Sequence, residues 1–90
     1  MAFKVYINNW DDMDAFNLAF SKTESFKRPR TYFCKIGGKS KQFCSVEGCY
    51  NFWCNNSHKS MLILIDGYIP KKTLKDWYAY VKTKKNKRRY

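Results

Sequence analysis

The chain has 90 residues, of which 44% are hydrophobic and 19% are aromatic, a composition that suits one folded domain and excludes a disordered chain. Eighteen Lys and Arg outnumber seven Asp and Glu, and the net charge of +11 predicts a polyanionic partner. The longest apolar run, Met61–Ile65, is too short to cross a bilayer, and no apolar run long enough for a signal peptide precedes Asp11. We therefore expect an intracellular, cytoplasmic protein without a membrane partner.

The first third of the chain predicts a strand followed by an amphipathic helix. Apolar and polar residues alternate over Phe3–Ile7, as in a strand with one buried face. Asn8-Asn9 ends the strand and offers the N-cap of a helix that runs to about Lys22. The spacing of its apolar residues places four of them on one face: Met13, Phe16, Ala19 and Phe20.

The middle of the chain predicts a hairpin and a further strand. Thr31–Ile36 and Gln42–Val46 are the two strands of the hairpin, and Gly37-Gly38 supplies its turn. Residues 47–60 show no clean period and predict a loop. Met61–Asp66 is an unbroken apolar run, which favours a central strand that is buried on both faces.

A capping-box pattern predicts the start of the last helix. Thr73 and Asp76 have the Thr-x-x-acid spacing of this motif. Apolar residues follow at helical spacing and are expected to dock on the sheet: Leu74, Trp77, Tyr78 and Val81. We expect this helix to end near Lys85.

The predicted order of elements is β-α-β-β-β-α. This order favours an α+β fold, with two helices packed on one face of a small antiparallel sheet. We expect residues 1–83 to form this single domain and residues 84–90 to form a basic C-terminal tail. The last five elements resemble the order of the double-stranded-RNA-binding domain, whose second helix opens with lysines, as Lys71-Lys72 do here. The resemblance implies that these lysines contact an RNA backbone.

Four cysteines and the only histidine lie within 25 residues: Cys34, Cys44, Cys49, Cys54 and His58. Tetrahedral zinc takes four ligands of these kinds, so the cluster predicts one zinc ion held by four of the five. The last part of the cluster, Cys49-x4-Cys54-x3-His58, resembles the end of CCCH-type RNA-binding zinc fingers. Two other states stay open, namely buried free thiols and two disulfides. A catalytic Cys–His pair lacks an evident orienting acid, and no other catalytic motif occurs, so we expect no enzymatic activity.

Two basic blocks are the candidate nucleic-acid contacts. On the last helix, Lys71, Lys75 and Lys82 fall within about 40° of one another, and Tyr78 borders them. The other basic residues of this block are Lys72, Lys84, Lys85, Arg88 and Arg89. The second block lies on the loop and hairpin and comprises Lys27, Arg28, Arg30, Lys39 and Lys41. Lysines on a helix are often only solvated, but the shared sign of each block favours phosphate contacts.

Aromatic residues beside these cations predict base stacking. Trp53, in the cysteine-rich segment, is the ring expected to stack on a base. Tyr32 and Phe33 are neighbours on a strand, so at most one of them is expected to be exposed.

The sequence therefore predicts a small basic nucleic-acid-binding protein that prefers RNA over DNA, without a small-molecule substrate. An alternative is a small viral or phage protein that binds a host protein and inhibits a host enzyme, defence or toxin system at its nucleic-acid-binding surface. The Lys- and aromatic-rich composition is typical of such proteins. A second alternative, a secreted cationic toxin, would require the cysteines to form disulfides.

Overall fold

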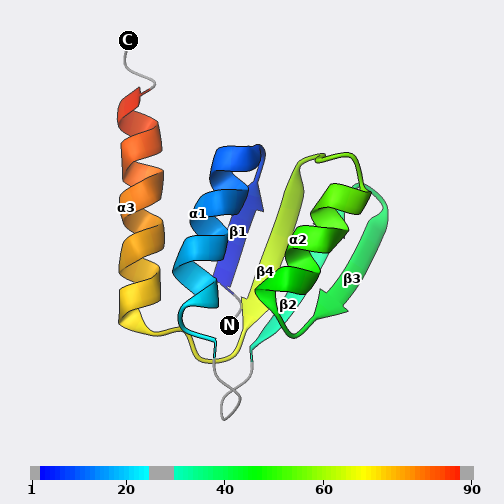
Figure 1. Cartoon of the computed structure of the whole chain (residues 1–90), viewed down its shortest axis with the longest axis horizontal. Coiled ribbons are helices and arrows are strands. Elements are labelled where there is room, and N and C mark those ends of the chain that lie inside the picture. The colour runs from blue at the N-terminus through cyan, green and yellow to red at the C-terminus, as the bar shows by residue number, and fades with distance from the viewer. Residues whose placement is uncertain (1–2, 25–29, 88–90) are drawn as a thin grey trace.

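The computed structural model describes residues 3–24 and 30–87, which form three helices and a four-stranded sheet (Figure 1). Their order along the chain is β1 (Phe3–Ile7), α1 (Trp10–Ser21), β2 (Thr31–Ile36), β3 (Lys39–Phe43), α2 (Val46–Asn55), β4 (Met61–Asp66) and α3 (Lys71–Lys87). The sheet order is β1-β4-β2-β3, with every neighbouring pair antiparallel. The predicted α+β class and antiparallel sheet are confirmed, and α2 is a third helix that the prediction lacked.

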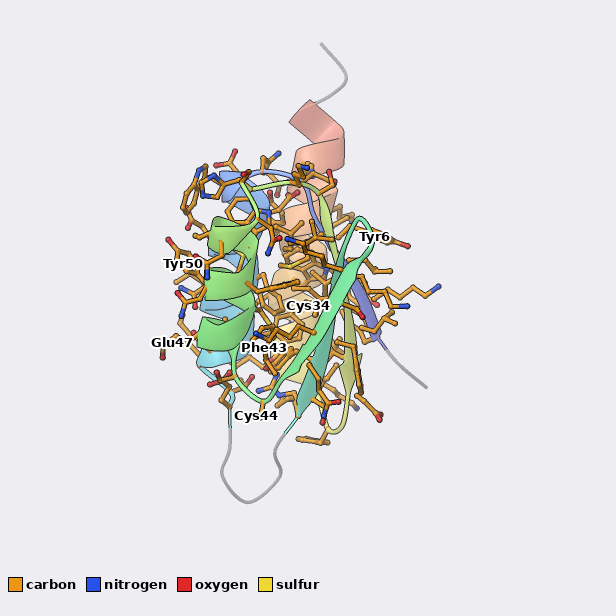
Figure 2. The ribbon with its side chains drawn as sticks, turned by 90° about the vertical axis from the view of Figure 1, so that its right-hand side faces the viewer. Tyr6, Cys34, Phe43, Cys44, Glu47 and Tyr50 are labelled. Carbon is orange, nitrogen blue, oxygen red and sulfur yellow. The ribbon has the colours of Figure 1, made fainter. Side chains whose placement is uncertain are left out.

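The helices lie on one side of the sheet (Figure 2). Alternation within each strand sends one set of side chains toward them, so that Val5, Ile7, Ile63 and Ile65 are buried. These residues meet the large rings of the helices, which are Phe16, Phe20, Trp53 and Trp77. Helix α3 packs along α1 at the β1 end of the sheet (Figure 1). The core therefore lies between the helices and one face of the sheet.

Helix α1 follows the prediction at both ends. Asn9 is its N-cap, and the Asn9 side chain accepts a hydrogen bond of 2.9 Å from the backbone N–H of Asp12. The predicted inner face is buried, whereas Leu18 on the outer face is 61% exposed. Asp12 departs from the surface role of a first-turn acid, because it is buried.

Helix α2 occupies the segment that was predicted to be a loop. Ser45 caps it by accepting a hydrogen bond of 3.2 Å from the N–H of Gly48. Val46, Cys49 and Trp53 recur at i, i+3 and i+7 and form its buried face. The returning strand of the hairpin accordingly ends at Phe43, and Val46 belongs to the helix instead. Because α2 lies between β3 and β4, the chain departs from the element order of the double-stranded-RNA-binding domain.

Strand β4 is central, as predicted, but only one of its faces is fully covered. Met61, Ile63 and Ile65 are buried, whereas Leu62 and Leu64 are half-buried on the opposite face. The expectation of burial on both faces is wrong, because the described helices all pack on the same side.

Helix α3 begins two residues before the predicted capping box. Thr73 is buried inside the helix, and its hydroxyl lies 2.6 Å from the hydroxyl of Thr23. Trp77 docks as predicted, but Tyr78 is 56% exposed and Tyr80 points inward instead. The helix continues through Lys87, so the first residues of the predicted tail are helical.

Candidate nucleic-acid interface

The sheet face opposite the helices combines apolar side chains with two lysines. Six residues form this surface, here called the open face: Lys4, Tyr6, Phe33, Lys35, Leu62 and Leu64. The strand register places Tyr6 and Lys35 on either side of Leu62, and Lys4 and Phe33 on either side of Leu64. Tyr6 is 58% exposed and Phe33 is 38% exposed. The two lysines thus stand at opposite corners of an apolar patch.

The lysines of α3 form a second basic surface. Lys71, Lys75 and Lys82 are exposed and share one edge of the helix, here called the lysine stripe. Tyr78 lies about 20° beyond the stripe at about 100° per residue, on the side of the helix where Val81 is half-buried. Tyr78 therefore separates the lysine stripe from the packed side of the helix.

A groove joins these two surfaces. It has a volume of about 300 Å³ and lies between β1 and α3, with Lys4 and Tyr6 on one wall and Tyr78 on the other. Phe3 packs edge-on against Tyr78, with a ring-centroid distance of 5.9 Å. The open face, the groove and the lysine stripe consequently form a continuous surface.

Most acidic side chains lie elsewhere. Asp11 and Asp14 are exposed on α1, and Glu47 is exposed on α2. Figure 2 shows Glu47 and Tyr6 on opposite sides of the molecule. Asp66, at the end of β4, is exposed beside the open face. The positive charge of the open face and lysine stripe is thus separated from the acids of the helical side.

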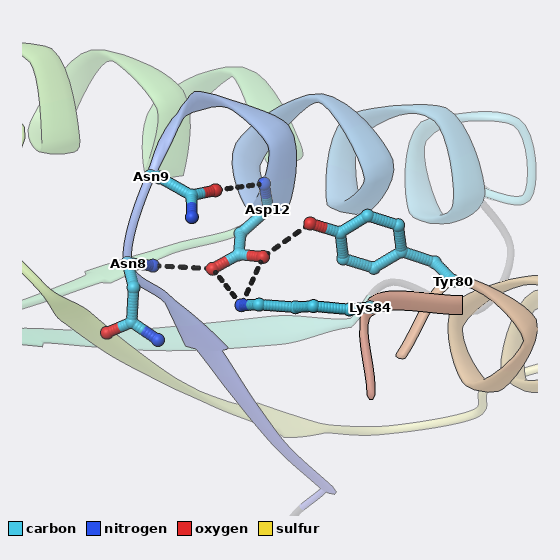
Figure 3. A network of polar contacts seen from close by, with 5 residues as sticks. All are labelled: Asn8, Asn9, Asp12, Tyr80 and Lys84. Carbon is cyan, nitrogen blue, oxygen red and sulfur yellow. Dashed lines mark hydrogen bonds and ion pairs between the residues drawn. The ribbon is translucent and has the colours of Figure 1, made fainter. Parts of the chain in front are cut away.

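Helix α3 is held in place by a buried carboxylate (Figure 3). Asp12 accepts hydrogen bonds from the Tyr80 hydroxyl at 2.5 Å, the Lys84 ammonium at 2.8 and 3.0 Å, and the Asn8 N–H at 2.8 Å. Burial opposes ionisation, but these donors together hold the pKa of Asp12 below its usual value. Burial and the hydrogen bond to Asp12 raise the pKa of Tyr80. The network fixes the orientation of the lysine stripe.

Two residues predicted to contact nucleic acid, Arg30 and Lys84, are bonded to other groups of the protein. Arg30 is 3% exposed, and its guanidinium donates hydrogen bonds to the Phe20 carbonyl and the Thr23 hydroxyl. The prediction that Arg30 binds at the surface is therefore wrong, because α1 and the loop after it provide acceptors in the core. Lys84 lines the groove between β1 and α3, but its ammonium is already paired with the carboxylate of Asp12.

The other predicted basic residues divide into three groups. Lys72 is exposed on α3 beside the lysine stripe. Lys39 and Lys41 are exposed on the edge strand β3, paired with the buried Ile36 and Cys34, and so point toward the helical side. Such lysines also protect an edge strand from pairing with another chain. Lys27, Arg28, Arg88 and Arg89, and the side chain of Lys85, lie outside the described part of the structure.

Trp53 cannot stack on a base in this structure. Its side chain is fully buried, and its indole N–H donates a hydrogen bond of 2.8 Å to the Lys59 carbonyl. Trp10 and His58 pack against it, with ring-centroid distances of 5.0 and 4.7 Å. The prediction of an exposed Trp53 is wrong, because Trp53 lies on the inner face of α2.

The cysteines are free thiols. Cys34 of β2 and Cys49 of α2 are buried together, and the side-chain hydrogen bond that the protonated Cys49 makes with Cys34, together with burial, raises the pKa of Cys49. Cys44 is exposed and Cys54 is half-buried. Within residues 3–24 and 30–87, no three His, Cys, Asp or Glu side chains lie close enough together to hold a metal ion. The zinc site stays a prediction, which metal analysis of protein purified without chelator would test.

Three residues of the open face were not identified from the sequence. Lys4, Tyr6 and Lys35 alternate with buried residues in β1 and β2, and this alternation already placed them on the opposite face. The expectation that at most one of Tyr32 and Phe33 is exposed is confirmed, because Tyr32 is fully buried. The predicted packing of both helices on one face already left the other face open, but the expected burial of Met61–Asp66 on both faces argued against an exposed site there.

A scan against protein-family models finds no match, and searches of curated proteins and of solved structures find no significant match. Of the helices described, none combines the length and apolar character needed to cross a membrane.

Proposed function

We propose that this protein binds single-stranded nucleic acid, with RNA preferred, through its open face and lysine stripe, and that it has no catalytic role. The observation that carries the proposal is the position of Tyr6 and Phe33 on a sheet face that also bears Lys4 and Lys35. Exposed rings stack on unpaired bases while neighbouring cations contact phosphates, which is how sequence-tolerant single-strand sites work. A duplex keeps its base faces stacked and offers the rings no equivalent contact.

The lysine stripe supplies phosphate contacts beside the open face. Ammonium groups act as point charges on flexible stems, which suits phosphates whose spacing varies along a single strand. The groove between β1 and α3 lets a strand pass from the rings of the sheet to Lys71, Lys75 and Lys82. We consequently expect the affinity to come mainly from electrostatic contacts with phosphates and to depend little on the nucleotide sequence.

A salt titration tests the proposal. If four to six phosphates are neutralised, log K should fall against log salt with a slope of roughly −3 to −4 for a single strand. Single-stranded RNA, single-stranded DNA of the same sequence and the RNA duplex should be compared at low salt, with the tightest binding expected for single-stranded RNA. No binding to any of the three at low salt would refute the proposal.

Two triple variants locate the phosphate contacts. Changing Lys71, Lys75 and Lys82 together to Gln should flatten the salt slope by about two units, if all three contact phosphate. The matched control changes Lys39, Lys41 and Lys59 to Gln, which removes the same charge from exposed positions outside the open face and stripe. The control should keep most of the slope, whereas equal losses in both variants would indicate non-specific attraction by net charge alone.

Binding to a host protein is the second candidate function. It is favoured by Leu18, which is 61% exposed in a groove between α1 and α3 beside Asp11 and Asp14. This combination of an exposed apolar side chain with acids fits a basic protein surface, such as one that binds nucleic acid. A pull-down with nuclease treatment discriminates, because a partner retained after nuclease through contacts that Leu18→Ser abolishes would favour this function.

A further inference from the structure

We propose that the groove between β1 and α3 holds one unpaired base of the bound strand, stacked between the rings of Tyr6 and Tyr78. This inference rests on the proposed function and goes beyond it, because it assigns one position on the surface to a base rather than to the backbone. It makes the groove the element that selects single strands over duplexes.

The walls of the groove have the chemistry that a base requires. Tyr6 and Tyr78 are 58% and 56% exposed, although both are large rings beside the packed edge of the sheet. The ring of Phe3 packs edge-on against the ring of Tyr78, with a ring-centroid distance of 5.9 Å. A ring that is held by a neighbour and still exposes a face, as Tyr78 does, presents that surface at a low cost in side-chain entropy. The volume of about 300 Å³ lies at the lower limit of small-molecule sites.

The ends of the groove differ in polarity. Lys4 stands beside the rings, where its ammonium can contact the phosphate that follows the bound base. Asn8 borders the other end, and its backbone N–H is held by Asp12 while its side-chain amide points away from that carboxylate (Figure 3). An amide both donates and accepts hydrogen bonds, as the edge of a base does. Asp12 itself is satisfied by its own donors and is not available to the base.

Geometry also explains why the occupant is a single strand. The groove runs along the edge strand β1, and the lysine stripe lies beyond Tyr78. A base inserted here leaves its backbone between Lys4 and the stripe, which matches negative charge with positive charge on both sides. A base within a duplex cannot enter, because it would first have to leave its stack and its partner.

Photo-crosslinking of the wild-type protein is the first test. A single-stranded RNA that carries 5-bromouridine is bound at low salt, irradiated and digested, and the crosslinked peptide is identified by mass spectrometry. Crosslinks to Tyr6 or Tyr78 are expected. Crosslinks found at Phe33 but at neither tyrosine would overturn the inference and leave the proposed function intact.

Substitutions at the two rings are the second test. Tyr6→Leu and Tyr78→Leu should each weaken single-strand binding roughly 5- to 150-fold while the salt slope is nearly unchanged. Tyr6→Phe and Tyr78→Phe keep the ring and should bind as the wild type does. Tyr68→Leu is the matched control, since Tyr68 is 55% exposed and does not line the groove.

The outcomes separate the two proposals. A 2-aminopurine base in the strand should lose fluorescence on binding to the wild type and to the Phe variants, but much less on binding to the Leu variants. Thermal melting checks that each variant is folded. Leu variants that bind with wild-type affinity and quenching would overturn the base site, whereas failure of the wild type to bind any strand would overturn the proposed function itself.

Discussion

Lys84 of α3 donates hydrogen bonds to both carboxylate oxygens of Asp12 in α1, at 2.8 and 3.0 Å, across 72 positions of the sequence. Asp12 is 1% exposed, whereas the Lys84 side chain is 34% exposed. The pair therefore bridges the core and the solvent, and it ties the helix that carries the lysine stripe to the rest of the fold.

Lys84→Met should destabilise the protein by about 3 kcal/mol, because it leaves a buried carboxylate with fewer donors. Lys82→Met is the matched control on the exposed edge of the same helix, and it should change stability by less than about 0.5 kcal/mol. Urea unfolding of both variants measures the difference. Equal stabilities would show that the ion pair contributes nothing to the docking of α3.

The same network predicts a dependence of stability on pH. The pKa of Asp12 is lower in the folded protein than its usual 3.8, so its ionised form stabilises the fold above that value. This contribution is lost as the pH falls below 3.8 and through the folded pKa. The stability advantage of the wild type over Asp12→Asn should therefore shrink as the pH is lowered from 7 toward 3, as urea titrations at each pH would show. An advantage that stays constant over this range would contradict the lowered pKa.

Gly48→Ala should destabilise the protein, although alanine favours a helix by about 1 kcal/mol over glycine. A methyl group at this position of α2 would lie 2.5 Å from Cδ1 and 2.8 Å from Cγ of Phe43. These atoms lie where the ring joins the Phe43 side chain, so they cannot move aside easily. We therefore expect a net loss of roughly 1–2 kcal/mol in the free energy of unfolding. Gly38→Ala is the control, since no atom lies within 4 Å of its added methyl group. Thermal melting should place Gly48→Ala below the wild type and Gly38→Ala near it.

Trp53→Ala should unfold or severely destabilise the protein, with a cost of roughly 3–5 kcal/mol. Its indole fills the space between α2, Trp10 and His58, and its N–H is bonded to the Lys59 carbonyl. Chemical unfolding measures the loss. A variant that kept wild-type stability but bound RNA less tightly would instead support the sequence-based prediction that Trp53 stacks on a base.

Several features of this protein are determined by local sequence. Strand β1 and helix α1 form where periodicity predicts them, and Asn9 is the cap because a short polar side chain can reach the free N–H of the first turn. That only one of the neighbours Tyr32 and Phe33 is exposed follows from strand alternation alone. The net charge and the spacing of the lysine stripe are also properties of the sequence itself.

Helix α2 was missed for a reason that concerns residue type. Gly48 and the asparagines of this segment are poor helix formers, and its cysteines were interpreted as metal ligands rather than as apolar residues. Counted as apolar, Cys49 completes the spacing of Val46 and Trp53. The Ser45 cap and the burial of that face against β2 outweigh the weak propensity.

Tertiary structure alone decided which polar and aromatic residues reach the surface. Arg30, Lys84 and Asp12 look like solvated charges in the sequence, yet their partners come from other elements of the fold. Tyr6 alternates like any strand residue, and it becomes a candidate ligand contact because the described helices all cover the other face. Periodicity specifies the two faces of a strand or helix, but which face is buried depends on the elements that pack against it, and those contacts join residues far apart in the chain.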